Sequence, residues 1–373
     1  MAAPVSEGQV LGGKFRVERV LGTGGMGVVV AAFHLQLEQR VALKFLLPEA
    51  AKEEQVVQRF AREARAAAKI QSEHVARVLD VGTLDTGAPY MVMEYLEGRD
   101  LDDAIKADGP LPVQVAVGYL MQACEAVAEA HALGIVHRDL KPANLFVAER
   151  ADGKRSIKVL DFGISKVLPH AQASAEPSLT ATSAIMGSPM YMSPEQLRSS
   201  RDVDVRADIW ALGIVLYEML TGANPFESGT VAEVCASILK DKPKPLSALR
   251  DDVPDGLEAV ILRCIEKDPD KRYANVAELT VALLSFGPPG CEHSIERVSS
   301  VLRNVSLRSA QVARAGTPAS RPPPAPAAVA ASGDGDRLTA AEVPVAKGAV
   351  AGSDRAALEL AATKASHGPA SPA

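Results

Sequence analysis

The chain has 373 residues, a formal net charge of −6 and a pI near 5.7. That length can bury a large core, and the acidic balance argues against a nucleic-acid-binding protein, which usually presents a basic face. No apolar run approaches the ~18 residues of a membrane span, and the first residues lack the basic and apolar regions of a signal peptide. The four cysteines show no CxxC spacing, which favours reduced thiols over disulfides or zinc ligands. We therefore expect a soluble cytoplasmic protein.

Short β-type runs dominate the first part of the chain, after an N-terminal extension over residues 1–14. Valine-rich runs predict antiparallel strands, and a segment rich in Ala, Glu, Gln and Arg predicts a helix. The predicted strands are Phe15–Val20, Gly27–Phe33, Arg40–Leu47, Val75–Leu84 and Pro89–Leu96, and the predicted helix is Glu53–Ile70. Together they predict a small β-rich lobe over residues 15–96.

Helical patterns dominate after a hinge near Glu94–Gly98. The predicted helices are Pro112–Leu133, Val205–Thr221, Val231–Leu239, Leu257–Ile265 and Asn275–Phe286, and a hairpin is predicted from Leu145–Ala148 and Ile157–Leu160. These elements predict a larger helical lobe over residues 97–286. The fold class is therefore predicted as α+β with two lobes.

The composition changes beyond Phe286 to a segment rich in Pro, Ala, Gly and Ser. Few bulky apolar residues remain, so residues 287–373 are predicted to be a mostly disordered tail that catalysis does not need. One patch, Ser294–Ala310, places Ile295, Val298, Leu302 and Val305 at helical spacing. A short helix lying on the main domain is favoured there over a membrane or partner helix.

A glycine-rich stretch joins the first two predicted strands. Gly22, Gly24 and Gly27 form the pattern GxGxxG, which also occurs in dinucleotide-binding folds. In those folds the loop opens a helix, whereas here it opens into the apolar run Val28–Phe33. The Walker pattern GxxxxGK[ST] is absent. Glycines at a hairpin tip let backbone N–H groups approach a phosphate chain, and a plain flexible hairpin is the alternative.

Lys44 lies midway along the apolar strand Val41–Leu47. A buried ammonium is costly unless it meets anions, and two are available: the phosphates of a nucleotide and a carboxylate of the following helix. Glu63 stands in the middle of that helix, whereas Glu53 and Glu54 fall near its start, where acidic residues favour the helix dipole. We therefore predict that Lys44 pairs with Glu63.

Two polar segments follow in the larger lobe: His137-Arg138-Asp139-Leu140-Lys141-Pro142-Ala143-Asn144 and Asp161-Phe162-Gly163. Phosphoryl transfer needs a cation on the phosphates, oxygen ligands for a metal ion and a carboxylate facing the acceptor hydroxyl. Asp139 would orient that hydroxyl and accept its proton, and Lys141 would neutralise the transferring group. Asn144 and Asp161 would supply oxygen ligands to Mg²⁺. Each residue alone is common in surface turns, but the ordered set indicates phosphoryl transfer.

These motifs resemble those of eukaryotic-type serine/threonine protein kinases, most closely those of the bacterial branch. The resemblance is carried by the two polar segments above and by Leu21–Gly27, Arg59–Ala64 and Tyr191–Gln196, and it covers roughly residues 15–286. It implies the two-lobed protein kinase fold. It also implies ATP as the phosphoryl donor, Mg²⁺ or Mn²⁺ as the metal ion, and serine or threonine hydroxyls of proteins as the acceptors.

The resemblance further implies a nucleotide site between the lobes. Met93 would be the gatekeeper residue, Glu94 to Leu96 would form the hinge that meets adenine, and Asp100 would bind the ribose. The implied nucleotide-binding residues are Leu21, Gly22, Thr23, Gly24, Gly25, Met26, Gly27, Val29, Ala42, Lys44, Met93, Glu94, Leu96 and Asp100. Glu195 would pair with Arg272, and Asp208–Gly213 would belong to a central helix beneath the catalytic loop.

Two other classes of function stay open. A catalytically weak or dead kinase-fold scaffold is disfavoured because Lys44, Asp139, Asn144 and Asp161 are all present. A small-molecule phosphotransferase of related fold is disfavoured because Ser193-Pro194-Glu195 and the loop before it are typical of the protein-directed enzymes of the family.

The segment between Asp161 and Glu195 carries a run of hydroxyl residues, Ser178–Ser183. In the bacterial kinases a Thr-x-Thr at this place is a self-phosphorylation site, which implies modification of Thr182 first and then Thr180. A phosphate there would bring negative charge to Arg138 and order the segment. Because one molecule would phosphorylate another, we expect a transient homodimer.

Overall fold

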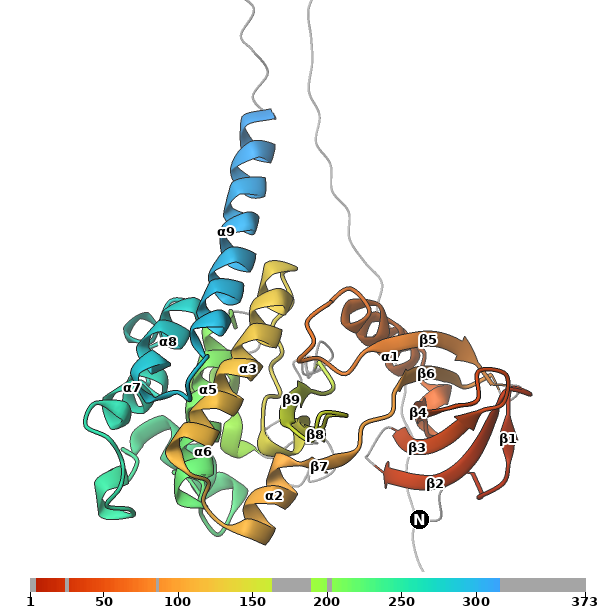
Figure 1. Ribbon diagram of the computed structural model, residues 1–373, viewed down its shortest axis with the longest axis horizontal. Helices are drawn as coiled ribbons and strands as arrows, with labels where there is room; N and C mark the ends of the chain where they lie inside the picture. The colour runs from red at the N-terminus through yellow and green to blue at the C-terminus, as the bar shows by residue number, and fades with distance from the viewer. Residues whose placement is uncertain (1–4, 24–26, 85–86, 163–188, 200–202, 316–373) are drawn as a thin grey trace, which may run out of the picture. The chain divides into compact units, whose positions relative to one another are not determined.

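The computed structural model describes residues 5–23, 27–84, 87–162, 189–199 and 203–315, with side chains as far as Arg303. The smaller lobe holds an antiparallel sheet in the order β1-β2-β3-β4-β6-β5 together with helix α1 (Figure 1). Its elements are β1 (Val10–Leu11), β2 (Phe15–Thr23), β3 (Gly27–His34), β4 (Gln39–Leu46), α1 (Glu54–Ala67), β5 (Val78–Thr83) and β6 (Pro89–Glu94).

Alternation along β3 and β4 builds the core of the smaller lobe. Val28 and Val30 of β3 and Leu43 of β4 are at most 1% exposed, as expected when every second side chain of a strand faces the core. Helix α1 has its own cluster, in which Phe60 and Ala64 are buried with Leu46 and Met91 of the sheet. This packing fixes the helix on the sheet beside the strand that carries Lys44.

The larger lobe is mainly helical, with a small sheet in the order β7-β8-β9 facing the smaller lobe (Figure 1). Its elements are β7 (Gly98–Asp100), α2 (Leu101–Asp108), α3 (Val113–Ala132), β8 (Leu145–Glu149), β9 (Arg155–Val159), α4 (Pro194–Arg198), α5 (Arg206–Thr221), α6 (Val231–Lys240), α7 (Leu257–Cys264), α8 (Val276–Leu283) and α9 (Glu292–Ala315). Single 3₁₀ turns lie at Ala50–Lys52, Pro142–Asn144, Pro189–Tyr191, Leu246–Ala248, Pro269–Lys271 and Leu284–Phe286.

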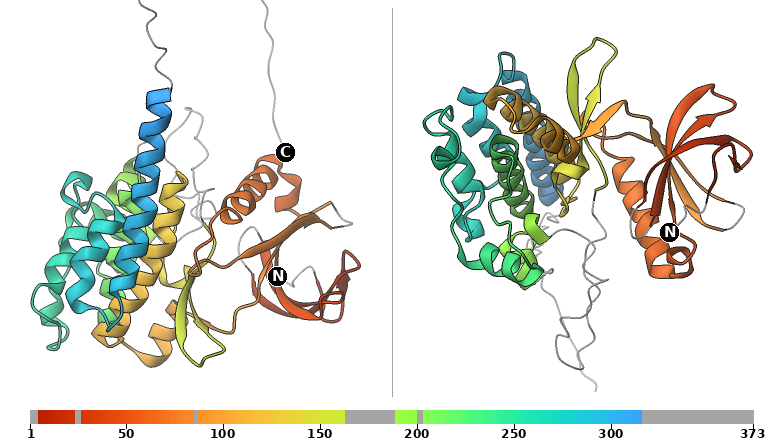
Figure 2. Two further views of the ribbon diagram at one scale, coloured as in Figure 1. Left: turned by 45° about the horizontal axis from the view of Figure 1, so that its top comes forward. Right: turned by 90° about the horizontal axis from the view of Figure 1, so that it is seen from below.

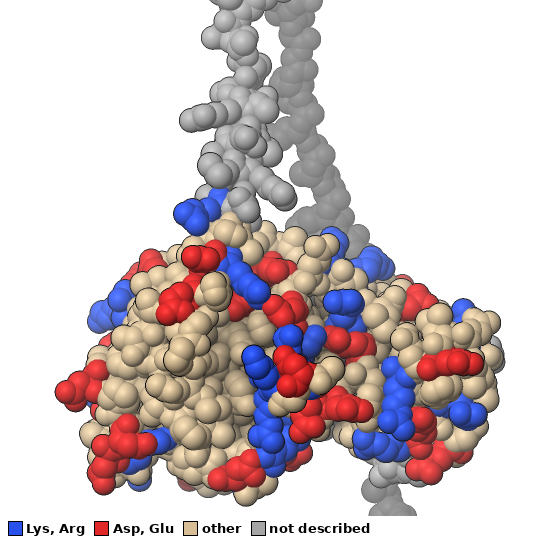
Figure 3. Space-filling model, in the orientation of Figure 1, with Lys and Arg blue, Asp and Glu red and all other residues tan. Residues whose placement is uncertain are grey.

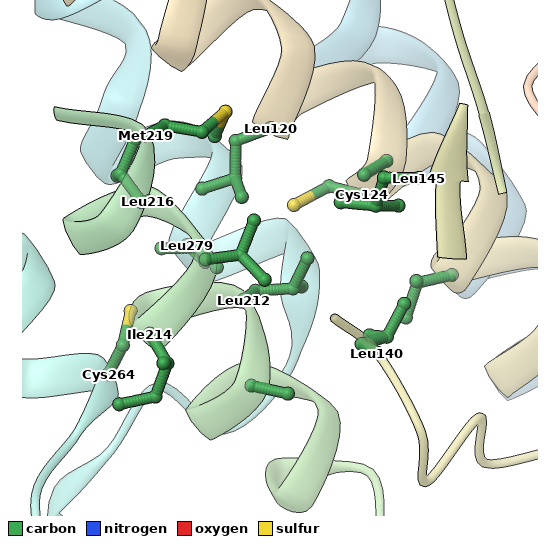
Figure 4. Packing of buried hydrophobic residues seen from close by; sticks show 14 of the residues in the cluster. Leu120, Cys124, Leu140, Leu145, Leu212, Ile214, Leu216, Met219, Cys264 and Leu279 are labelled. Carbon is green, nitrogen blue, oxygen red and sulfur yellow. The ribbon is translucent and has the colours of Figure 1, made fainter. Parts of the chain in front are cut away.

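Helix α5 forms the centre of this lobe. Its side chains are buried almost throughout, which is typical of a helix surrounded by others rather than lying at the surface. Leu212 and Leu216 of α5 share one core cluster with Leu120 of α3 and Leu279 of α8 (Figure 4). The rings of Trp210 and Phe226 stack with centroids 5.6 Å apart. A rigid scaffold therefore lies directly below the polar loop that precedes β8.

Most predicted elements agree with the structure to within a few residues, and the two-lobed α+β fold is confirmed. Four elements were missed: β1, β7, α2 and α4. β1 and β7 are too short for a period-2 pattern to be recognised. The two helices do carry N-terminal signals, since Asp100 caps α2, and Ser193 with Gln196 forms a capping box on α4. No helix in the described part of the chain is both long and apolar enough to cross a membrane.

Helix α9 departs from the composition-based prediction of a tail after Phe286. The helix is longer than the predicted Ser294–Ala310, and it lies alongside α3 and α8 (Figures 1 and 2). Val298 is 1% exposed, and Ile295 and Leu302 pack against the core of the larger lobe. Three apolar residues at helical spacing are enough to attach the helix to the domain, although the composition around them is weakly apolar.

Candidate active site

Strand β4 carries Lys44 to the inner side of the smaller lobe, in register with Val29 of β3 and Met91 of β6. Its Nζ lies 2.5 Å from Oδ1 of Asp161 and 3.5 Å from Oε1 of Glu63. Burial disfavours the charged form, but the two carboxylates outweigh it and raise the pKa of Lys44 above its ordinary value. Lys44 is therefore a fixed cation at neutral pH.

The partner predicted for Lys44 is the one the structure supplies. Glu63 lies in the middle of α1, with its side chain 13% exposed, whereas Glu53 and Glu54 are exposed at the start of the helix. Phe60 precedes Glu63 by one helical turn and is buried against the sheet, so that this face of α1 is turned towards β4.

Asp208 of α5 holds the start of the predicted catalytic loop, residues 137–144. Its carboxylate accepts hydrogen bonds of 2.8 Å from the backbone N–H groups of His137 and Arg138 and contacts His131 Nε2 at 2.8 Å. Burial raises the pKa of Asp208, but the hydrogen bond with His131 and the neighbouring charges outweigh burial and lower it. Arg138 has a φ of 63°, a left-handed conformation that costs free energy and that these bonds can maintain.

Two predicted catalytic side chains, Asp139 and Lys141, meet the predicted metal ligand Asn144 at the 3₁₀ turn before β8. Asp139 Oδ2 lies 3.4 Å from Lys141 Nζ and accepts a hydrogen bond of 3.1 Å from Asn144 Nδ2. Asn144 Nδ2 also donates to the backbone carbonyl of Asp139 at 2.7 Å. The loop thus presents a carboxylate beside a cation, which is the arrangement expected of a general base next to a charged group being transferred.

The donors of this loop suit a divalent metal ion. Because the Asn144 amide nitrogen is committed to Asp139, its oxygen is the atom left to act as a ligand. Asp161 stands two residues after the end of β9 and adopts a left-handed φ of 45°, and its carboxylate faces Lys44. Amide and carboxylate oxygens are the ligands that Mg²⁺ and Mn²⁺ accept, so the residue types fit the predicted metal.

A cleft of about 510 Å³ is lined by the sheet of the smaller lobe and, from the larger lobe, by Asp161 and by Ala143 next to Asn144. Eight of the predicted nucleotide-binding residues line it: Leu21, Gly22, Val29, Ala42, Met93, Glu94, Leu96 and Asp100. Glu63 and Asp161 also line it, whereas Thr23, Gly27 and Lys44 are described but do not line it. Gly27 has a different role: a Cβ there would lie 2.7 Å from the carbonyl oxygen of Phe45, so glycine allows β3 to approach β4 closely.

Several lining residues were not predicted. They include Phe146 of β8, Val159 at the end of β9, and Ala67, Val75 and Met91 of the smaller lobe. The first two had a signal, because they flank Asn144 and Asp161 within the predicted hairpin. The other three come from elements whose packing onto the cleft cannot be read from the sequence.

The hinge is hydrogen-bonded to β9, the strand that leads to Asp161. Glu94 Oε1 accepts hydrogen bonds from the backbone N–H of Arg77 at 2.9 Å and from Lys158 Nζ at 2.8 Å. Lys158 belongs to β9, so one side chain of the hinge contacts the larger lobe. This contact fixes the back of the cleft.

A buried ion pair supports the loop from the far side. Arg272, whose side chain is 0% exposed, donates to Glu195 at 2.7 and 2.8 Å, as the sequence predicts. Burial raises the pKa of Glu195, but Arg272 outweighs it and lowers the pKa. Gln196, next to Glu195, donates to the carbonyl of Arg138 at 3.1 Å.

The predicted Gly24, Gly25, Met26, Thr180 and Thr182 lie outside the described residues.

The chain is similar to several curated bacterial kinases. It is 42% identical over 287 residues to serine/threonine-protein kinase Pkn1 of Myxococcus xanthus, covering 75% of this chain and 40% of that protein. It is 38% identical over 270 residues to Pkn3 of the same organism, covering 72% and 49%. PknB of Mycobacterium leprae is 36% identical over 277 residues, covering 74% and 43%. The chain thus spans less than half the length of these relatives.

The fold and the family agree with that similarity. The crystal structure of the Mycobacterium tuberculosis PknI kinase domain superimposes with a TM-score of 0.58 at 29% sequence identity, covering 75% of this chain and 98% of that one. The family model described as the protein kinase domain matches residues 15–282, which include residues of both lobes and every predicted catalytic residue. This chain belongs to the protein kinase domain family.

Proposed function

We propose that the chain transfers the γ-phosphoryl group of ATP to serine or threonine hydroxyls of proteins. The observation that carries the proposal is a cleft lined by Asp161, which pairs with Lys44. Ala143, in the loop where Asp139, Lys141 and Asn144 contact one another, lines the same cleft. Relatives named serine/threonine-protein kinases support the acceptor class. A divalent metal ion follows from the family, and we propose Mg²⁺, with Mn²⁺ as a substitute.

The proposed mechanism assigns one task to each side chain. Lys44 binds the α- and β-phosphates while Glu63 keeps it in place. Asp139 accepts a hydrogen bond from the acceptor hydroxyl and finally takes its proton, and Lys141 compensates the charge on the transferring group. Asn144 and Asp161 would hold the metal ion, which when bound would neutralise negative charge on the phosphate oxygens.

A catalytically dead scaffold is the competing proposal. It is disfavoured because Lys44 and both metal-binding side chains are present and in hydrogen-bond or ion-pair contact with their neighbours. A small-molecule phosphotransferase is disfavoured by the Glu195–Arg272 pair of the segment typical of protein-directed kinases. Location in the cytoplasm and the absence of nucleic-acid partners stay predictions that rest on the sequence.

Phosphate transfer to a general protein substrate tests the proposal. The purified chain, incubated with γ-labelled ATP and Mg²⁺, should label serine or threonine, and Lys44→Ala should reduce labelling by about 10² or more. Lys52→Ala removes an exposed lysine whose pairing with Glu49 is also exposed, so it should label as the parent does. An inactive parent, or a Lys44→Ala protein as active as Lys52→Ala, would favour the scaffold.

A further inference from the structure

Helix α9 lies outside the residues matched by the protein kinase model, yet it contacts the same side of the domain as the end of α1. Ser294 and Val298 are its buried residues in the part of the chain with described side chains, Arg297 stands next to Val298, and Cys291, just before the helix, is buried as well. The packing partners of α9 are α3 and α8 (Figure 2). Charged side chains of both signs gather between α9 and the smaller lobe (Figure 3).

A buried carboxylate of α3 makes this contact specific. Glu125, whose side chain is 8% exposed, accepts hydrogen bonds from Ser294 Oγ at 2.5 Å and from Arg297 Nη1 at 3.1 Å. His74 Nε2 lies 3.8 Å from the same carboxylate. A buried carboxylate is costly without such partners, and α9 supplies two of the three.

Arg297 also reaches the smaller lobe. Its Nη1 lies 2.5 Å from Oε1 of Glu73, whose other oxygen accepts from Arg150 at 3.3 Å. The hydrogen bond from Arg297 is the main reason that the pKa of Glu73 lies below its ordinary value. Glu73 belongs to the segment between α1 and β5, so one guanidinium joins α3 of the larger lobe to the chain that leaves α1.

That segment, residues 71–76, is also hydrogen-bonded to β9, the strand that leads to Asp161. The backbone N–H of Val159 donates to the carbonyl of His74 at 2.7 Å, and the N–H of Ala76 donates to the carbonyl of Val159 at 3.0 Å. The N–H of Gln71 donates to Glu129 of α3 at 2.8 Å. The segment therefore lies between the end of α1, which carries Glu63, and the end of β9, which leads to Asp161.

We propose that Arg297 is a positioning residue of the active site, acting through Glu73 and residues 71–76 to hold α1, and with it Glu63, against Lys44. The ion pair it supports has a separation of 3.5 Å between Lys44 Nζ and Glu63 Oε1. Arg297 and Glu73 are 56% and 47% exposed, so the link is of moderate strength. The kinetic part of this inference rests on the proposed kinase activity.

The test uses Arg297→Gln in the full chain, with Arg303→Gln as the matched control. Arg303 lies on the same helix, and its described hydrogen bond goes to Ser299 of α9 itself. Arg297→Gln should lower kcat about fivefold with little change in the KM for ATP, and should speed amide hydrogen exchange in α1 by a similar factor. Arg297→Lys should restore most of both. Arg303→Gln should change neither.

A double variant separates positioning from general destabilisation. If Arg297 acts through Glu73, then Glu73→Gln combined with Arg297→Gln should lower kcat no further than the stronger single variant. The proposal would be overturned if Arg297→Gln had the same kcat and the same α1 exchange rate as Arg303→Gln. Both quantities are measured well below the melting temperature of each protein. If the parent chain transfers no phosphate, the proposed function fails, while the exchange of α1 still decides whether α9 positions it.

Discussion

Lys267 is a partly exposed residue whose ammonium is covered by two aromatic rings. Its Nζ lies 4.0 Å from the ring centroid of Phe226 and 5.0 Å from that of Trp210, and the described residues offer it no hydrogen-bond partner. Burial lowers its pKa to about 8. The ring faces favour the charged form, so the two effects oppose each other, and burial is the stronger for an ammonium without hydrogen bonds.

Replacing Lys267 by methionine should therefore stabilise the fold at pH 7. The folded pKa lies below the unfolded one, so stability rises with pH between about 8 and 10.5, where only the unfolded chain keeps the proton. Lys267→Met should gain about 1 kcal/mol at pH 7, after allowance for partial exposure, and the gain should shrink at pH 9.5. Urea unfolding at both pH values measures this, with the exposed Lys240→Met as control. A loss of stability at pH 7 would mean that the ring contacts dominate.

At the scale of single residues, the sequence predicted the polar side chains that stand in unusual surroundings, such as a lysine within an apolar strand. Lys44 in an apolar strand needed a carboxylate, and a mid-helix glutamate met that need. Met91 and Ala67 were not predicted to line the cleft, because apolar side chains in strands and helices have no signature that separates a cleft wall from a core. The contact of Arg297 with Glu73 joins positions 224 residues apart and needed the fold.

Among the elements, α9 carries the clearest difference between composition and structure. The chain after Phe286 is rich in Pro, Ala and Gly, which predicted a dispensable tail. Only the spacing of Ile295, Val298 and Leu302 pointed to a packed helix. Val298 at 1% exposure and the pairing of Glu125 with Arg297 make that helix part of the larger lobe.

Truncation distinguishes these two views. A chain that ends at Phe286 would expose the apolar α3 surface that α9 covers and would remove two of the partners of Glu125. Its free energy of unfolding should fall by about 3 kcal/mol or more, as thermal and urea unfolding would record. A chain that ends at Pro318 retains all of α9 and should unfold as the full chain does. Equal stability of the two truncated proteins would show that α9 contributes nothing to the fold.

The two lobes together form the cleft, and the segment that would regulate it, Ser178–Ser183, lies outside the described residues. We predict that one molecule phosphorylates another at Thr182 and then at Thr180. The initial rate per molecule should then rise with protein concentration, and activity should rise with the phosphate content found by intact-mass analysis. Thr180→Ala combined with Thr182→Ala should remove both effects. A rate independent of concentration would indicate modification within one molecule.

At the scale of the whole molecule, the two-lobed fold could be predicted because the motifs occur in one order along the chain. Lys44 lies far in the sequence from Asp139, Asn144 and Asp161, and a phosphoryl-transfer site is an arrangement that uses all four. How the lobes are joined behind the site was not predictable, since that depends on surface side chains such as Glu73 and Glu94. Those contacts follow from packing rather than from any local pattern.

The central claim is that Asp139 takes the proton of the acceptor hydroxyl in this cleft. The most direct measurement is the turnover of Asp139→Asn with a protein substrate, together with its affinity for ATP and Mg²⁺. Asparagine keeps the shape of the side chain but cannot accept the proton, so kcat should fall by about 10² or more while nucleotide affinity stays close to that of the parent. Turnover equal to that of the parent would contradict the account.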